Sequence, residues 1–155
     1  DDGIKANIVN QYIPILNQSV NYYLQSLNSP ITFNIDKNLE VRLDSRYPGE
    51  FSYHSLSMGE RQRIDLSMSF AWRRVAGIKN SVNTNLLILD ETFDASIDGD
   101  GTDDLLAILE DIHRHGVNIF VISHKGGLED KLRATIKIEK QNGFSKITKE
   151  IENHH

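Results

Sequence analysis

The chain has 155 residues, of which 39% are hydrophobic and 25% charged, and its formal net charge is −5 at pH 7. This length and composition predict one globular domain with room for a core. The acidic balance excludes a general attraction to DNA and leaves only a local basic patch open.

Several classes of protein are excluded by what the sequence lacks. It has no cysteine, which rules out a disulfide framework and a thiolate zinc site. No apolar run approaches the roughly 18 residues that a membrane span needs, and no secretory leader is visible. We expect a cytoplasmic protein without membrane contact. Residues 1–153 are expected to form the domain, and His154 with His155 to be the remnant of a purification tag.

The first predicted element is a long amphipathic helix over residues 4–28, indicated by apolar side chains at helical spacing. Pro14 lies inside this stretch and predicts a kink or a break. We interpret the apolar stripe as core packing, with pairing to a partner helix as the alternative. Residues 31–35 and 39–43 then alternate apolar and polar side chains, which predicts a hairpin with one face in water.

A second helix is predicted from about residue 58 to a stop at Gly77. Ser57 and Glu60 form the Ser-x-x-Glu pattern of a capping box at its start. Gly59 lets the backbone approach a ligand closely, and the free N–H groups of a helix start favour anions. The first turn is therefore a candidate anion site; a helix cap without a ligand is the alternative.

The central stretch of the sequence is the apolar run Leu86–Leu89, which leads directly into Asp90 and Glu91. Such an unbroken run predicts a parallel strand that is buried on both faces. Ligands of parallel sheets bind beyond the carboxyl ends of the strands, where the two carboxylates would emerge. Two charges at the edge of a dry core indicate metal or phosphate chemistry.

A strand–helix–strand unit is predicted from this stretch onward. After an acidic, Gly-containing loop over residues 95–101, Thr102 or Asp103 would cap a helix that ends at Gly116. Residues 117–122 form the next apolar strand, so a parallel pair with a right-handed crossover is expected. His124 would then emerge beside Asp90 and Glu91, although a single histidine after a strand is more often structural.

The last predicted elements are a short helix over residues 128–132 and a hairpin. The strands of this hairpin, residues 134–139 and 144–148, are joined through Asn142-Gly143, which is a strong hairpin signal.

Four motifs now stand in a fixed order. Residues 56–60, Leu-Ser-Met-Gly-Glu, resemble the signature motif of ATP-binding-cassette (ABC) ATPases, and residues 86–91 resemble their Walker B strand with its catalytic Glu. Residues 95–98 resemble the D-loop, and Ser123-His124 resembles the switch histidine. The resemblance covers about residues 50 to 140.

Within that superfamily the chain looks like the SMC and SbcC-type DNA-repair branch. Glu60 stands where transporters commonly have Gln, and in this branch a long coiled coil splits the ATPase head. Residues 85–91 and 123–126 resemble most the large ATPase subunits of the recombination exonucleases of T4-like phages. The resemblance implies an α/β fold, the C-terminal lobe of such a head, with a mostly parallel sheet, flanking helices and peripheral β-hairpins. The helix over residues 1–28 would continue from the base of the coiled coil.

The resemblance also implies roles and cofactors, namely ATP and Mg²⁺. Asp90 would hold the metal, Glu91 would polarise the attacking water, and His124 would contact the γ-phosphate. The remaining expected contacts form between two heads. The nucleotide of the second head would be contacted by Ser57, Met58, Gly59 and Glu60. The interface between the heads would contain Ser96 and Asp98.

Two departures from the family pattern matter. Met58 stands where the signature usually has Gly, and the sequence contains no Gly-x-x-x-x-Gly-Lys phosphate loop. We therefore expect the N-terminal half of the same head to supply that loop, and the chain alone to be inactive. The other expected partners are a second head, a nuclease subunit and DNA, in the host cytoplasm if a phage encodes the protein.

Three alternative functions stay open at this point: a structural SMC-type ATPase without a nuclease, the ATPase of a transporter, and a binding module without activity. The arginines of the second helix are also open to two interpretations. They are either a solvated, salt-bridged surface or a route for signalling or DNA contact. These arginines are Arg61, Arg63, Arg73 and Arg74.

Overall fold

A computed structural model describes residues 2–45, 52–80, 84–93 and 99–152 of the chain. The chain divides into two compact units, one up to Ile122 and one from Ser123 onward, and each is described by itself. None of the helices in the described ranges combines the length and apolar content that crossing a bilayer requires.

The first helix, α1 (Asp2–Ser26), continues through Pro14, so the predicted break is wrong. Proline removes one backbone hydrogen bond, to the carbonyl four residues earlier. Here Pro14 lies on the exposed side of α1, while its neighbours Ile13 and Leu16 are buried in the core. Burial of the apolar side holds the helix together across the lost bond.

The predicted hairpin is confirmed as β1 (Ile31–Ile35) paired antiparallel with β2 (Val41–Ser45). The inward side chains of β1 are buried against α1, and the alternate ones face water. Two side-chain amides of α1 also act as a strand partner for β1. Asn17 exchanges two 2.9 Å bonds with the backbone of Ile35, and Asn21 exchanges bonds of 2.7 and 2.9 Å with Phe33.

This pairing works because two spacings match. Four residues of helix rise about 6 Å, and two residues of strand rise about 6.6 Å. A pair of asparagines one helical turn apart therefore reaches alternate residues of β1, satisfying backbone groups that would otherwise lack partners.

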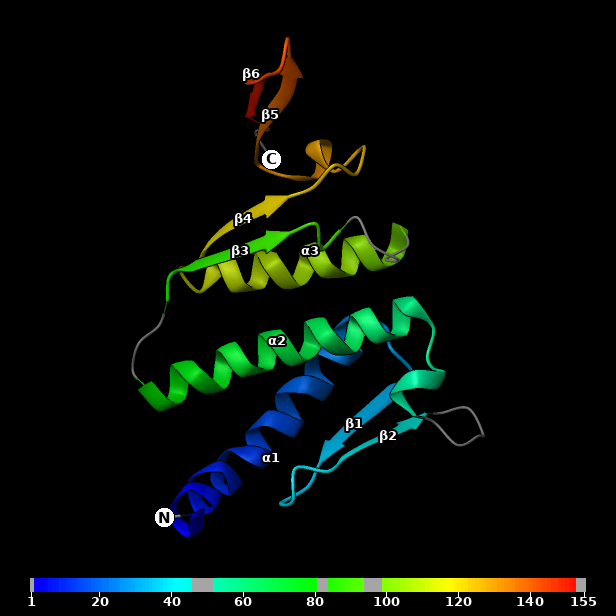
Figure 1. Cartoon of the computed structure of the whole chain (residues 1–155), viewed down its shortest axis with the longest axis vertical. Coiled ribbons are helices and arrows are strands. Elements are labelled where there is room, and N and C mark those ends of the chain that lie inside the picture. The colour runs from blue at the N-terminus through cyan, green and yellow to red at the C-terminus, as the bar shows by residue number, and fades with distance from the viewer. Residues whose placement is uncertain (1, 46–51, 81–83, 94–98, 153–155) are drawn as a thin grey trace. The chain divides into compact units, whose positions relative to one another are not determined.

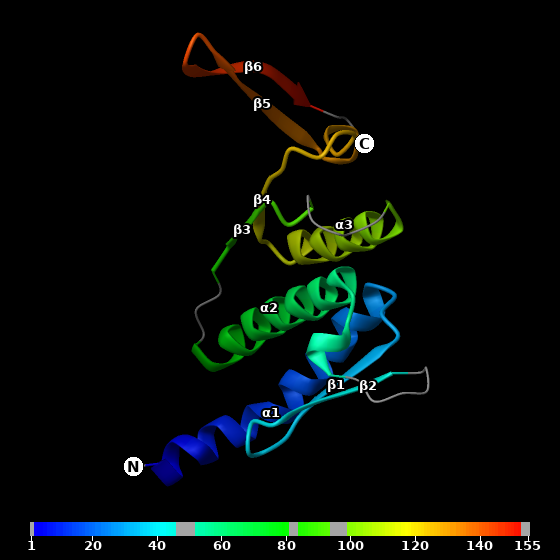
Figure 2. The same ribbon diagram turned by 45° about the vertical axis from the view of Figure 1, so that its right-hand side comes forward.

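The second long helix, α2 (Met58–Asn80), packs along α1, as both views show (Figures 1 and 2). It follows a short 3₁₀ turn, η1 (Tyr53–Ser55). The predicted stop at Gly77 is wrong, because Gly77 is not among the described residues with a positive φ and the helix runs on to Asn80. The core cluster between α1, β1 and α2 consists of Ile13, Leu16, Val20, Leu24, Ile31, Phe33, Ile35, Leu56, Ile64, Ala71 and Val75.

The predicted parallel pair is confirmed. Strand β3 (Leu86–Asp90) lies beside β4 (Asn118–Ile122) in the register Leu86↔Asn118 to Asp90↔Ile122, and α3 (Gly99–Arg114) connects them. Helix α3 begins at Gly99, earlier than expected, so the predicted caps Thr102 and Asp103 lie inside the helix, where Thr102 is buried. It ends as predicted, with Gly116 at φ +86°.

Burial of β3 on both faces is not observed. One face of the pair packs with α3, and on it Leu89 is 8% exposed. The other face consists of alternate residues of both strands, whose apolar members are 45–60% exposed in the described chain. These apolar side chains are Leu86, Ile88, Phe120 and Ile122, which we call the open face.

The second unit contains the short 3₁₀ helix η2 (Glu129–Lys131) and the predicted hairpin, β5 (Ala134–Gln141) with β6 (Phe144–Glu152). The two strands are antiparallel, with a shift of register between Lys137 and Ile138. Asn142 and Gly143 have φ of +52° and +84°, which is the two-residue turn expected for Asn-Gly.

Candidate functional site

The start of α2 is a complete capping box, as predicted. The backbone N–H and the hydroxyl of Ser57 donate to Glu60 Oε2 at 2.8 and 2.7 Å, and the backbone N–H of Glu60 donates to Ser57 Oγ at 3.3 Å. The bond from the Ser57 hydroxyl, followed by that from its backbone, holds the pKa of Glu60 below its ordinary value. A carboxylate at a helix N-terminus is also favoured by the helix dipole.

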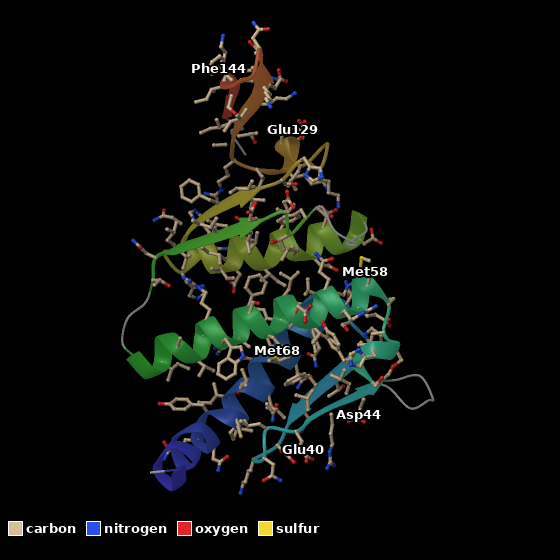
Figure 3. The ribbon with its side chains drawn as sticks, viewed as in Figure 1. Glu40, Asp44, Met58, Met68, Glu129 and Phe144 are labelled. Atoms are coloured by element: carbon tan, nitrogen blue, oxygen red, sulfur yellow. The ribbon has the colours of Figure 1, made fainter. Side chains whose placement is uncertain are left out.

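This arrangement limits how the helix start could meet a phosphate. The one hydroxyl proton of Ser57 points to Glu60, while a phosphate offers acceptors only. A bound phosphate would therefore use backbone N–H groups of the first turn, or turn the Ser57 hydroxyl away from Glu60. Met58 is 66% exposed at this helix start (Figure 3).

An open hollow of about 350 Å³ lies beside the first two turns of α2. At its edge the Tyr53 hydroxyl donates to the two carboxylate oxygens of Asp65 at 2.9 Å, and this bond raises the pKa of Tyr53. The sequence did not predict the contact between Tyr53 and Asp65. The two residues lie on different elements, η1 and α2, and their separation of 12 residues fits no helix or strand repeat. The hollow is lined by Tyr53, Met58, Arg61, Gln62 and Asp65.

Asp90 and Glu91 are exposed at the carboxyl end of β3, where the sequence placed them. The N–H of Glu91 donates to the carbonyl of Ile122 at 2.8 Å, which extends the parallel ladder by one residue. Glu91 has φ +52°, a left-handed conformation that is unfavourable for a non-glycine residue and is concentrated at functional sites. Two residues later Phe93 is fully buried, so the chain turns at Glu91 and is anchored in the core.

A side chain of α2 reaches this turn. Gln62 Nε2 donates to the carbonyl of Thr92 at 2.8 Å, across 30 residues of sequence. At the other end of β3, the guanidinium of Arg73 donates to the Thr84 hydroxyl at 3.0 Å and the Leu86 carbonyl at 3.2 Å, and also to the Thr84 carbonyl. Arg73 is thus a structural contact to β3, which neither sequence interpretation of the arginines anticipated.

The carboxylates suit Mg²⁺, which prefers oxygen ligands and is usually held by one or two carboxylates together with phosphate oxygens and water. Within the described ranges, no three His, Cys, Asp or Glu side chains gather in a group that could hold a metal ion by itself. Asp90 and Glu91 are thus oxygen donors of a kind that suits Mg²⁺, and a metal bound there would need further ligands from outside the described residues.

The other predicted site residues have different outcomes. His124 is exposed and belongs to the second unit, so its place beside Asp90 and Glu91 stays a prediction. Ser96 and Asp98 lie outside the described residues.

Comparison with known structures identifies the fold. A chain solved in work on ATP-driven dimerization and DNA-stimulated activation of SMC ATPases matches with a TM-score of 0.76 and 15% identity, over 92% of this chain and 88% of that chain. The SMC head domain of Pyrococcus furiosus, with an extended coiled coil and bound to the C-terminal domain of ScpA, matches with a TM-score of 0.72 and 14% identity, over 97% of this chain and 38% of that one. The fold is that of the C-terminal lobe of an SMC-type ATPase head, as the motifs predicted.

Sequence comparison gives the nearer relatives. The chain is 39% identical over 125 residues to exonuclease subunit 2 of Enterobacteria phage T4, covering 81% of this chain, and 34% identical over 148 residues to that of Escherichia phage RB69, covering 96%. It spans 22% and 26% of the lengths of these two proteins. The SbcC component of the nuclease SbcCD of Rhodobacter capsulatus is 26% identical over 133 residues, or 84% of this chain and 10% of that protein. No protein-family model matches the chain. The expected resemblance to phage exonuclease and SbcC proteins is confirmed.

Proposed function

We propose that this chain is the C-terminal half of an ATP-hydrolysing head in a nuclease complex for DNA double-strand-break repair and recombination. The observation that carries the proposal is the pair of exposed carboxylates at the end of β3, with Glu91 fixed to β4 through the carbonyl of Ile122. The relatives, which are named as components of exonucleases and of the nuclease SbcCD, favour this interpretation over a transporter or a structural SMC protein.

The proposed chemistry assigns one task to each residue. Glu91 orients the attacking water and withdraws its proton, and its backbone bond to β4 fixes the point of the main chain from which its side chain extends. His124 contacts the γ-phosphate. Asp90 would hold Mg²⁺, which when bound neutralises charge on the phosphates. The protein therefore contributes mainly position and electrostatics, which is what phosphoryl transfer requires.

The signature residues act on a second head in this proposal. At the start of α2, Ser57 and Met58 are exposed, whereas Gly59 and Glu60 are half-buried. This helix start can meet a nucleotide from outside the chain. ATP held between two copies would then join the heads, and Ser96 with Asp98 would lie in their interface. Pairing of heads by ATP would regulate DNA processing.

The open face supports a role for the N-terminal half of the same head. Parallel sheets are covered on both faces, and contiguous exposed apolar side chains mark an interface. The chain also lacks a Gly-Lys phosphate loop. We therefore assign that loop, and the cover of the open face, to the N-terminal half, and we expect this chain to be inactive by itself.

A nuclease subunit and DNA complete the proposed complex, which would work in the host cytoplasm if a phage encodes it. Affinity purification of the full-length protein from its native host tests this part. Recovery of a nuclease subunit supports the proposal, whereas an assembly that organises DNA and contains no nuclease supports the structural SMC alternative.

The catalytic assignment is tested by Glu91→Gln in the full-length protein. ATP turnover should fall by at least about a hundredfold, because Gln cannot accept the proton of the attacking water. Pairing of heads in ATP, measured by light scattering, should persist. The matched control is Glu40→Gln, the same change at an exposed residue in the β1–β2 connection. Unchanged turnover in Glu91→Gln would refute the role given to Glu91.

A further inference from the structure

Side chains of helix α2 form hydrogen bonds near both ends of strand β3. The helix and the strand run in opposite directions, so the start of α2 lies at the end of β3 that bears the carboxylates (Figure 1). Gln62 donates a hydrogen bond to Thr92, the residue after Glu91. Arg73 donates hydrogen bonds to Thr84 and Leu86, at the start of the strand. The helix that begins with the signature motif therefore fixes the strand that ends with the carboxylates.

Gln62 contacts the backbone directly after Glu91, a residue in an unfavourable conformation. Glu91 is held in a left-handed conformation at φ +52°, between its own N–H bond to Ile122 and the buried ring of Phe93. The Thr92 carbonyl, which accepts from Gln62 at 2.8 Å, belongs to the peptide that joins Thr92 to Phe93. The bond fixes the orientation of that peptide, and with it the ψ of Thr92, so it holds the path of the chain between the turn at Glu91 and the buried Phe93.

The amide oxygen of Gln62 has a different environment from its nitrogen. Gln62 Oε1 is buried and has no hydrogen-bond partner among the described residues. A buried acceptor without a partner destabilises a fold, by about 1–3 kcal/mol in general. An apolar side chain of similar length would remove that penalty but would leave the Thr92 carbonyl without its donor, so the two effects on stability oppose each other.

We propose that Gln62 is a positioning residue for ATP hydrolysis, which holds the turn after β3 so that Glu91 faces the attacking water. Through Gln62, a nucleotide contact at the start of α2 is transmitted to the Glu91 of the same head. That Glu91 acts on the nucleotide of its own head, so the two nucleotide sites of a head pair are coupled within each chain. This inference rests on the function proposed above.

The test is Gln62→Met in the full-length protein. Met has a similar length but no N–H, so the bond to Thr92 is lost while the fold is retained. We expect kcat for ATP to fall by about ten- to a hundredfold, because small displacements of a catalytic group have effects of this size. KM for ATP and the pairing of heads should stay within about twofold of the wild type, since neither depends on where Glu91 points.

Two further variants separate positioning from a general structural effect. Gln62→His keeps an N–H at a similar reach and should restore most of the lost kcat. Gln25→Met makes the same change at an exposed residue of α1 and should leave turnover unchanged. The melting temperature of Gln62→Met should stay close to that of the wild type, because removing the unpaired Oε1 offsets the lost bond to Thr92, so that a lower kcat is not explained by unfolding.

The outcomes separate this inference from the proposed function. If the wild type hydrolyses ATP in a Glu91-dependent manner and Gln62→Met keeps its kcat, the positioning role is overturned and the proposed function stands. A rise in KM with loss of head pairing would also overturn it, because Gln62 would then act in nucleotide binding. If the wild type does not hydrolyse ATP, the proposed function fails and this inference fails with it.

Discussion

The two regions that carry the candidate site differ in how completely this chain builds them. The region of α1, β1 and α2, which presents the signature motif, encloses its own apolar core, and Val20, Leu24 and Phe33 are at most 3% exposed. The pair β3–β4, which presents Asp90 and Glu91, leaves one apolar face open. The contrast shows that this chain suffices to shape the helix start, whereas the carboxylate strand is covered on one side only.

The backbone of the two regions shows the same difference. Asn17 and Asn21 of α1 satisfy the backbone of β1 along the edge that β2 does not occupy. Strand β3 has β4 as its strand partner in the described chain, and side chains of Gln62 and Arg73 contact the backbone near its two ends. The strand that bears the carboxylates therefore depends on neighbours at a distance in sequence.

Matched leucine truncations in the isolated chain test this contrast most strongly. Leu24→Ala should lower the free energy of unfolding by about 3 kcal/mol, because Leu24 is 1% exposed and its loss leaves a cavity. Leu86→Ala, at a residue that is 45% exposed, should lower it by about 1 kcal/mol or less. Urea unfolding of both variants measures the difference. Equal losses would mean that the open face is buried in the isolated chain.

A smaller effect is expected at the helix start, where Glu60→Gln removes a charged cap. The pKa of Glu60 lies below its ordinary value in the folded state, so its ionised form stabilises the fold above that ordinary value. The stabilisation by the ionised carboxylate is lost as the pH falls through the lowered pKa of Glu60. At pH 7 the variant should therefore be less stable than the wild type by under about 1 kcal/mol.

Thermal unfolding at pH 7 and at pH 3 checks this sign. The difference in melting temperature between the wild type and Glu60→Gln should be smaller at pH 3, where the protonated Glu resembles Gln. Glu40→Gln is the control, since no capping contact of the Glu40 side chain is seen in the described chain. A larger difference at pH 3 would contradict the capping role of Glu60.

Local sequence patterns predicted the parts of the site that are built from local interactions. The capping box of Ser57 and Glu60 lies within one helical turn, and the Asn142-Gly143 turn lies within two residues. The parallel pair was also predictable, because uninterrupted apolar strands on either side of a helix have few other arrangements. Asp90 could thus be placed at the carboxyl end of β3 from the sequence alone.

Tertiary packing decided what the patterns missed. Helix α1 continues through Pro14, because its buried neighbours outweigh a local cost of about 3 kcal/mol. Helix α2 continues through Gly77 to Asn80, where the local cost is only about 1 kcal/mol. The contact of Gln62 with Thr92 spans 30 residues and follows no periodicity. Exposure of the open face could not be predicted either, since an apolar run looks the same whether its cover lies in this chain or in another.

The most direct test of the central claim is reconstitution of the head from two halves. This chain and the N-terminal half of the full-length protein, produced separately and mixed, should copurify and hydrolyse ATP, whereas this chain alone should not. Phe120→Asp, on the open face, should fold with a melting temperature near that of the wild type but fail to copurify and fail to restore hydrolysis. Hydrolysis by this chain alone at the rate of the mixture, or normal assembly of Phe120→Asp, would contradict the account.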